Sequence, residues 1–351
     1  MPKVIRVLVV DDSALVRNIL SQGLSIDPGI DVVGTASDPY IARDKIVELQ
    51  PDVLTLDVEM PRMDGVAFLR KLMPQYPIPT VMVSSLTQRG KQITIDALDA
   101  GAVDFVSKPT SNIAAGLNAM LMELRAKVKI ASTANVSHWK GRRPIQPLQA
   151  APRASKALSE STDKVIAIGA STGGTEAIRR VVEELPATTP GVVIVQHMPS
   201  GFTKMFADRL NQLCHMQVKE AEDGDRIRSG LILIAAGGMQ MKVVRSGGFY
   251  QVRCGGTEKV SGHCPSVDVM MHSVAQQVGS NAVAAMLTGM GQDGAEGMLA
   301  MKTGGARCIA QDEATSVVFG MPKVAYEKGG AERLVPLDKV APALLGLLTE
   351  K

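Results

Sequence analysis

Apolar and polar positions along the chain form two blocks with the same kind of pattern. Between residue 3 and about residue 126, short β-branched apolar runs alternate with stretches of helical period, which is typical of a parallel sheet with crossover helices. Runs such as IRVLVV are continuous, as expected for strands that are buried on both faces. We predict a doubly wound (βα)5 α/β domain over residues 1–126. Its five strands are expected at Ile5–Val10, Ile30–Ala36, Val53–Asp57, Thr80–Ser84 and Phe105–Ser107.

The second block begins at Lys164 and continues to residue 351. Its main apolar runs are VIAIGA, VVIVQ, LILIAA, AVAAML and ARCIAQ, and a helix is expected from about Thr175. Between the third and fourth runs, MKVVRSGGFYQVRC has the pattern of a β-hairpin with Gly247 and Gly248 at its turn. We therefore predict a doubly wound, mostly parallel α/β domain with a β-hairpin over residues 164–351.

The segment between the blocks, residues 127–163, follows a helix predicted at about Ile113–Ile130. It is rich in Ala, Ser, Pro, Gln and basic residues without sustained periodicity, which predicts an exposed linker. Residues 131–163 hold five basic and two acidic residues, which equals the net charge of +3 of the whole chain. The folded blocks are jointly neutral, and only 3% of residues are aromatic, so nucleic acid is not an expected partner.

Length and residue usage agree with a soluble, two-domain cytoplasmic protein. A chain of 351 residues exceeds the usual size of a single core. No run approaches the roughly 18 apolar residues of a membrane span, and the apolar N-terminal run ends in two aspartates instead of a signal-peptide cleavage site. The cysteines are widely spaced, as is typical of reduced thiols, at Cys214, Cys254, Cys264 and Cys308.

Charged residues follow the predicted strands of the first block. Asp11 and Asp12 close the first strand, while Asp57 closes the third. Because the carboxyl ends of parallel strands meet at one edge of a sheet, these carboxylates should lie close together, and Mg²⁺ would offset their repulsion. A carboxylate held in this way can accept an activated phosphoryl group, with Lys108 and Ser84 compensating the added charge.

The motifs VVDDS, TLDVEMPRMDG, VSS and SKP, in this order and spacing, resemble the receiver domain of two-component response regulators over residues 3 to about 126. The resemblance implies a flavodoxin-like fold, phosphorylation at Asp57 and switching through Ser84 and Lys108. It also implies that Mg²⁺ is held by Asp11, Asp12, Asp57 and the Glu59 carbonyl group.

The second block opens with VIAIGASTGGTEAIRRVVEEL, which predicts a strand, a glycine-rich turn and a helix, with Ser171 on the turn. A dinucleotide site would need GxGxxG and an acidic residue at the end of the next strand, but that strand ends in Gln196 and His197. A phosphate loop would need GK followed by Ser or Thr, which the sequence lacks. The spacing Gly169-x-Ser171-x-Gly173 fits a nucleophile elbow, although that pattern alone is weak.

Two residues can complete a serine hydrolase site. His197 ends the strand after Ser171 at the same sheet edge, where it can act as the base, and Asp293 in the loop TGMGQDG can orient the imidazole. The chain order Ser, His, Asp differs from the Ser, acid, His order of α/β-hydrolases and indicates a separate fold lineage. The remaining histidines are weaker candidates: His138, His215, His263 and His272.

The motifs GASTGGTEA, VVIVQHMP, LTGMGQDGAEGM and QDEATSVVFGMP closely resemble the catalytic domain of the chemotaxis response-regulator protein-glutamate methylesterases, the CheB family, over residues 164 to about 348. The resemblance implies demethylation of glutamyl methyl esters on chemoreceptors with release of methanol, and deamidation of receptor glutamines. It implies a chemotaxis histidine kinase as phosphodonor and no cofactor for the esterase reaction. The implied site residues are Ser171, His197 and Asp293 as the triad, with Met290 and Thr172 at the oxyanion or substrate site.

Two other functions stay open. A DNA-binding response regulator would need a basic recognition helix after the linker, whereas the second block offers glycine-rich loops at strand ends. The second block could also be a catalytically silent interaction module. If it is an esterase, we expect the unphosphorylated receiver to inhibit it and phosphorylation to relieve that inhibition.

Overall fold

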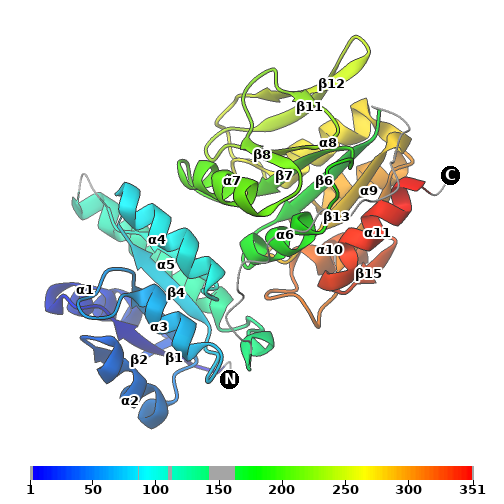
Figure 1. Cartoon of the computed structure of the whole chain (residues 1–351). Coiled ribbons are helices and arrows are strands. Elements are labelled where there is room, and N and C mark those ends of the chain that lie inside the picture. Colours follow the sequence, from blue (N-terminus) through cyan, green and yellow to red (C-terminus); the bar gives the residue numbers. More distant parts are fainter. Residues whose placement is uncertain (1–2, 86, 110–112, 142–162, 350–351) are drawn as a thin grey trace. The chain divides into compact units, whose positions relative to one another are not determined.

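The structure is a computed structural model of the chain, and it describes residues 3–85, 87–109, 113–141 and 163–349. The chain divides into two compact units, residues 1–146 and 147–351 (Figure 1). Each unit has its own parallel sheet and its own core. Among the described residues, none of the helices combines the length and the apolar character needed to span a bilayer.

The first unit contains a five-stranded parallel sheet with the strand order β2-β1-β3-β4-β5. This order confirms the predicted (βα)5 domain with a flavodoxin-like fold. Helix α1 packs beside α5, and α3 packs beside α4. The strands are β1 (Ile5–Val10), β2 (Ile30–Ala36), β3 (Val53–Asp57), β4 (Thr80–Ser84) and β5 (Asp104–Ser107). The helices are α1 (Ala14–Ser25), α2 (Pro39–Leu49), α3 (Gly65–Leu72), α4 (Gln88–Asp99) and α5 (Ile113–Ala131).

Local sequence explains where these elements begin. All residues of β3 and β4 are buried, as their continuous apolar runs predict. Four helices start directly after a residue whose side chain accepts a hydrogen bond from a backbone N–H of the first turn, which satisfies a group that the helix itself leaves unpaired. These N-cap residues are Ser13, Asp38, Asp64 and Thr87.

The chain that leaves α5 stays in contact with the first unit. A short 3-10 helix, η1 (Ser137–Trp139), brings Trp139 over Gly101, where an added Cβ atom would lie 3.0 Å from the indole ring. The N–H of Gly141 also donates a hydrogen bond to the carbonyl oxygen of Pro74 at 2.8 Å. The linker predicted over residues 127–163 therefore begins inside α5, and its part from 142 to 162 lies outside the described residues.

The second unit is built on a seven-stranded parallel sheet with the order β15-β14-β13-β6-β7-β10-β8. Its strands are β6 (Val165–Ala170), β7 (Gly191–Gln196), β8 (Gln217–Glu220), β10 (Leu231–Ile234), β13 (Ala282–Met286), β14 (Arg307–Gln311) and β15 (Arg333–Val335). The helices are α6 (Gly174–Glu183), α7 (Phe202–Leu213), α8 (Val267–Gln277), α9 (Ala295–Thr303), α10 (Met321–Glu327) and α11 (Leu337–Thr349), with a 3-10 turn η2 (Gly279–Asn281).

A small antiparallel sheet accompanies the large one, with the order β11-β12-β9. Its strands are β9 (Arg226–Ile227), β11 (Met241–Ser246) and β12 (Phe249–Cys254). Ser246 pairs with Phe249, so Gly247 and Gly248 form the turn of the predicted hairpin, which is confirmed. The short strands β8, β9 and β15 were not predicted from the sequence.

Candidate active site and phosphorylation site

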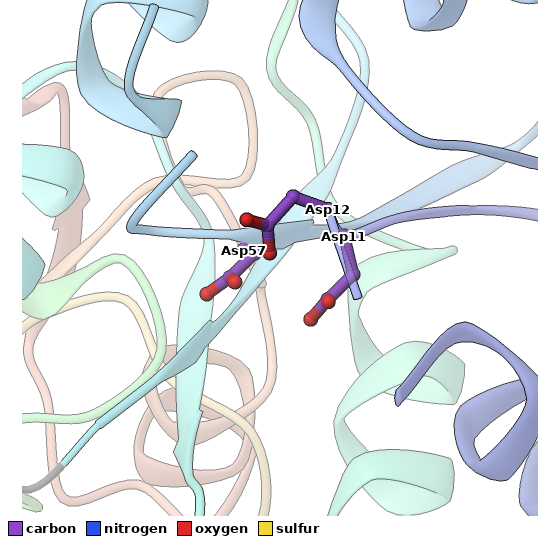
Figure 2. A group of neighbouring side chains, drawn as sticks. All are labelled: Asp11, Asp12 and Asp57. Carbon is purple, nitrogen blue, oxygen red and sulfur yellow. The ribbon is translucent and has the colours of Figure 1, made fainter. Parts of the chain in front are cut away.

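Three carboxylates gather at the carboxyl ends of β1 and β3 (Figure 2). Ligand oxygens of Asp11, Asp12 and Asp57 all lie within 4.8 Å of one another. Asp11 and Asp57 are buried and Asp12 is exposed. The set offers only oxygen ligands and clustered negative charge, which fits a hard cation such as Mg²⁺.

Lys108, which follows β5, is the cation of this cluster. Its Nζ atom lies 3.1 Å from Oδ2 of Asp11 and 3.0 Å from Oδ2 of Asp57. Burial disfavours the ammonium group, but the two carboxylates outweigh this effect and raise the pKa of Lys108. Burial also raises the pKa of Asp57 to about 6, because the attraction of Lys108 only partly offsets burial and the repulsion from Asp11.

The other two predicted residues of this site lie beside the cluster. Glu59 is exposed, and its backbone N–H bonds the Asp57 carboxylate. Ser84 is buried at the end of β4, where its hydroxyl accepts a hydrogen bond from Thr94 at 2.5 Å and donates one to the Gly90 carbonyl at 3.2 Å. The Ser84 hydroxyl is thus bonded to the start of α4 in this structure.

In the second unit, Ser171 lies directly after β6, next to the point where the strand order of the sheet reverses. Strand β6 has β7 on one side and β13 on the other, although β13 follows much later in the chain. Loops at the carboxyl ends of strands diverge at such a point and leave a crevice in which α/β proteins bind ligands. The loops after β6, β7 and β13 carry Ser171, His197 and Asp293 respectively.

The turn that carries Ser171 requires glycine. Gly173 has a φ angle of 75°, and a Cβ atom there would lie 2.5 Å from the Val317 side chain. The N–H of Ser171 donates to the carbonyl oxygen of Thr288 at 3.0 Å. The strand-turn-helix path of a nucleophile elbow is therefore formed here, and it is tied to the loop after β13.

His197 and Asp293, which are 96 residues apart in the sequence, form a short hydrogen bond. The Nε2 atom of His197 lies 2.7 Å from Oδ2 of Asp293. This bond sets Nε2 as the protonated nitrogen and leaves the lone pair on Nδ1. Among the described residues, no group hydrogen-bonds to this buried Nδ1 atom, which makes it the nitrogen available to a reacting group.

The Asp293 carboxylate lies at the N-terminus of α8. It accepts hydrogen bonds from the Ser266 hydroxyl at 2.7 Å, the Val267 N–H at 2.7 Å and the Asp268 N–H at 3.2 Å. Burial alone would raise the pKa of Asp293, but the hydrogen bonds from His197 and Ser266 outweigh it and hold the pKa below its usual value. The buried carboxylate is therefore ionised at neutral pH.

His263, a weaker candidate from the sequence, contacts the predicted base directly. Its ring stacks on that of His197, with centroids 3.6 Å apart and planes 6° from parallel. Burial, with a smaller effect of His197, lowers the pKa of His263 to about 4, so this ring is neutral at pH 7. This contact could not be predicted from the sequence, because residues 255–266 have neither strand nor helix periodicity.

The loop after β13 is held by side-chain hydrogen bonds from three directions. The Thr288 hydroxyl donates to the Thr172 carbonyl at 3.0 Å and accepts from the Val318 N–H at 2.9 Å, and the Thr288 N–H donates to Oε1 of Gln311 at 2.8 Å. Thr172 is buried, whereas Met290 is 47% exposed.

The remaining histidines lie in η1 (His138), between α7 and β8 (His215) and in α8 (His272).

Comparison with known proteins gives matches to both units. Residues 166–344 match the family model of the CheB methylesterase, and residues 7–118 match that of the response regulator receiver domain. A relative from Syntrophotalea carbinolica, named protein-glutamate methylesterase/protein-glutamine glutaminase, is 73% identical over 351 residues, which are 100% of this chain and 99% of that protein. A relative of the same name from Sulfurimonas denitrificans is 55% identical over 99% of both chains.

A solved structure also resembles the second unit. The crystal structure of the Thermotoga maritima CheB methylesterase catalytic domain is 38% identical in sequence, with a TM-score of 0.51. The match covers 52% of this chain and 98% of that structure.

The neutral state of His263 predicts a pH dependence of stability. Its pKa is about 4 in the folded protein and 6.5 in an unfolded chain, so the unfolded state binds more protons between these values. His263 therefore makes the second unit less stable as the pH falls from 6.5 towards 4. His263→Phe keeps a stacked ring without this titration, and calorimetric melting should show a smaller loss of Tm over this range than in the wild type. If Tm falls equally with pH in His263→Phe and in the wild type, the lowered pKa of His263 is contradicted.

The Ser266 hydroxyl both caps α8 and bonds Asp293. Ser266→Ala should lower the free energy of unfolding by about 2 kcal/mol, the sum of a lost cap and a lost hydrogen bond to a charged group. Ser266→Thr keeps the hydroxyl, so its free energy of unfolding should fall by clearly less. Denaturant titration of both variants tests this expectation. An equal decrease in the free energy of unfolding of the two variants would contradict it.

Proposed function

The chain belongs to the CheB methylesterase family, and we propose that Ser171, His197 and Asp293 form its catalytic triad. The protein is a protein-glutamate methylesterase and protein-glutamine glutaminase of chemotaxis whose receiver domain makes it regulated by phosphorylation. The observation that carries the triad is the 2.7 Å bond between His197 and the buried Asp293, formed at the sheet edge that also bears Ser171.

In the proposed reaction, the Ser171 hydroxyl attacks the side-chain carbonyl carbon of a glutamyl methyl ester. With Nε2 bonded to Asp293, Nδ1 of His197 accepts the serine proton and then passes it to the departing methoxy group, which leaves as methanol. Water, deprotonated by the same nitrogen, then hydrolyses the acyl-serine to glutamate. A glutamine substrate follows the same path with ammonia as the leaving group.

The surroundings of the triad support these roles. Asp293 is held ionised by three donors besides His197, so it can stabilise the imidazolium that forms at each step. The loop with Met290 and the backbone around Thr172 border Ser171, and we assign to them the oxyanion and substrate contacts. Because the loop is fixed by Thr288 and Gln311, its backbone donors need little reorganisation during the reaction.

For the receiver domain, we propose that Asp57 accepts the phosphoryl group and that Asp11, Asp12, Asp57 and the Glu59 carbonyl hold Mg²⁺. When bound, the cation would offset the charge of the clustered carboxylates and of the phosphoryl oxygens. Lys108 already bridges Asp11 and Asp57 and can pair with the phosphoryl group after transfer. The Ser84 hydroxyl would have to exchange its bond to Gly90 for one to that group, which would couple phosphorylation to the start of α4.

We further propose residues 1–126 as the receiver domain, 127–163 as the linker and 164–351 as the catalytic domain. The substrates are chemoreceptors, the phosphodonor is a chemotaxis histidine kinase, and the compartment is the cytoplasm. All four cysteines are free thiols, which supports a reducing compartment.

Ser171→Ala should lower methanol release from methylated receptor membranes by about a thousandfold or more, because the triad then lacks its nucleophile. The melting temperature should stay near that of the wild type. Ser229→Ala, an exposed serine before β10, is the matched control and should keep full activity. Retained methanol release by Ser171→Ala would rule out the triad.

Asp57→Asn should abolish labelling of the protein by a radioactive small phosphodonor and the accompanying rise in methanol release. The same loss is expected for the wild type after chelation of divalent cations, since the carboxylate cluster then stays uncompensated. Asp44→Asn, on the exposed side of α2, should be labelled normally. Labelling of Asp57→Asn at the wild-type level would place the acceptor elsewhere.

A further inference from the structure

Gln196, the last residue of β7, connects the two strands that carry the nucleophile and the base. It is 3% exposed. Its Nε2 atom donates one hydrogen bond to the carbonyl oxygen of Ser171 at 2.9 Å and a second to the carbonyl oxygen of His197 at 3.1 Å. One side-chain amide therefore binds the backbone of both residues.

The position of this amide matters because the ladder between β6 and β7 ends there. Ala170 pairs with Gln196, and the last backbone bond runs from the His197 N–H to the Ala170 carbonyl at 3.2 Å. Beyond that bond the chains separate into the turn of Ser171 and the loop of His197. The Gln196 side chain adds one more cross-link past the end of the ladder, where the reacting side chains begin.

The environment of Gln196 selects a primary amide. Two carbonyl oxygens lie on one side of it, so the group facing them must supply two N–H donors, which rules out a carboxylate or a thioether. On its other side, Oε1 is buried and has no hydrogen-bond partner among the described residues. Oε1 lies against Gly174, where an added Cβ atom would be only 2.1 Å away.

The unpaired Oε1 distinguishes Gln196 from other buried glutamines of the second unit. Oε1 of Gln240 accepts from the Ser266 N–H, and Oε1 of Gln311 accepts from the Thr288 N–H. Burying an acceptor without a partner costs stability. Gln196 thus lowers stability through its unpaired Oε1 atom, while its two N–H groups bond the carbonyl oxygens of Ser171 and His197. This combination favours a functional over a purely structural role.

We propose that Gln196 is a positioning residue that sets the separation and orientation of Ser171 and His197 through their carbonyl groups. This inference rests on the proposed triad. Because the amide touches neither the substrate nor the reacting atoms, its loss should affect the rate of the chemical step and leave substrate binding unchanged. A misplacement of about 1 Å at a reacting group can cost roughly a hundredfold in rate.

The test is a kinetic comparison of full-length variants with methylated receptor membranes as substrate. Gln196→Met has a similar length and no donor, and its kcat should fall roughly 10- to 100-fold while KM stays within about twofold of the wild type. The control is Ser273→Ala, which removes a buried hydroxyl that likewise bridges two elements, α8 and β11. This control should lose stability and keep its kcat.

Gln196→Ala repeats the test if the methionine variant does not fold, since alanine also lacks the donors and adds no polar group to the buried position. A wild-type kcat in a folded Gln196 variant, with only a lower Tm, would overturn the positioning role and leave the triad intact, provided that Ser171→Ala is inactive. Activity of Ser171→Ala would overturn both the triad and this proposal.

Discussion

The buried carboxylate of Asp293 is the constraint on which the proposed catalytic site of the second domain depends. An ionised group can be buried only where charge and donors compensate it. Here the compensation comes from the first turn of α8, from the Ser266 hydroxyl and from the His197 ring. These groups lie on separate segments, so the hydrogen bonds that compensate one charge fix the loop after β13, the start of α8 and the His197 ring together. The helix dipole adds to the stabilisation.

The buried carboxylates of the receiver domain are compensated less completely than that of Asp293. Asp11 and Asp57 share a single lysine, and the pKa of Asp57 rises instead of falling. A carboxylate that is fully bonded, as Asp293 is, serves as a fixed electrostatic partner. One that is undercompensated favours ligands that bring positive charge. The same balance between burial and compensation thus lowers the pKa of Asp293 in one domain and raises the pKa of Asp57 in the other.

Much of the fold, and the positions of several site residues, could be predicted from the sequence. Continuous apolar runs mark buried parallel strands, whose carboxyl ends share one edge. That rule placed Asp57, Lys108, Ser171 and His197. It could not reveal the stacked His263 or the donors of Asp293, because both depend on residues 255–266, which have no periodicity. The short strands β8, β9 and β15 carry too few residues for a pattern. The bonds of Ser84 to the first turns of α4 and of Gln196 to two carbonyl groups follow from tertiary packing alone.

Trp139 has a consequence for spectroscopy. It is the only tryptophan of the chain, and it packs against the first unit beside Gly101, which lies between α4 and β5. Intrinsic fluorescence excited at the red edge of the absorption band therefore arises in the receiver half of the protein. Circular dichroism, by contrast, averages over both halves. A comparison of the two signals can separate the melting of one domain from that of the other without any attached dye.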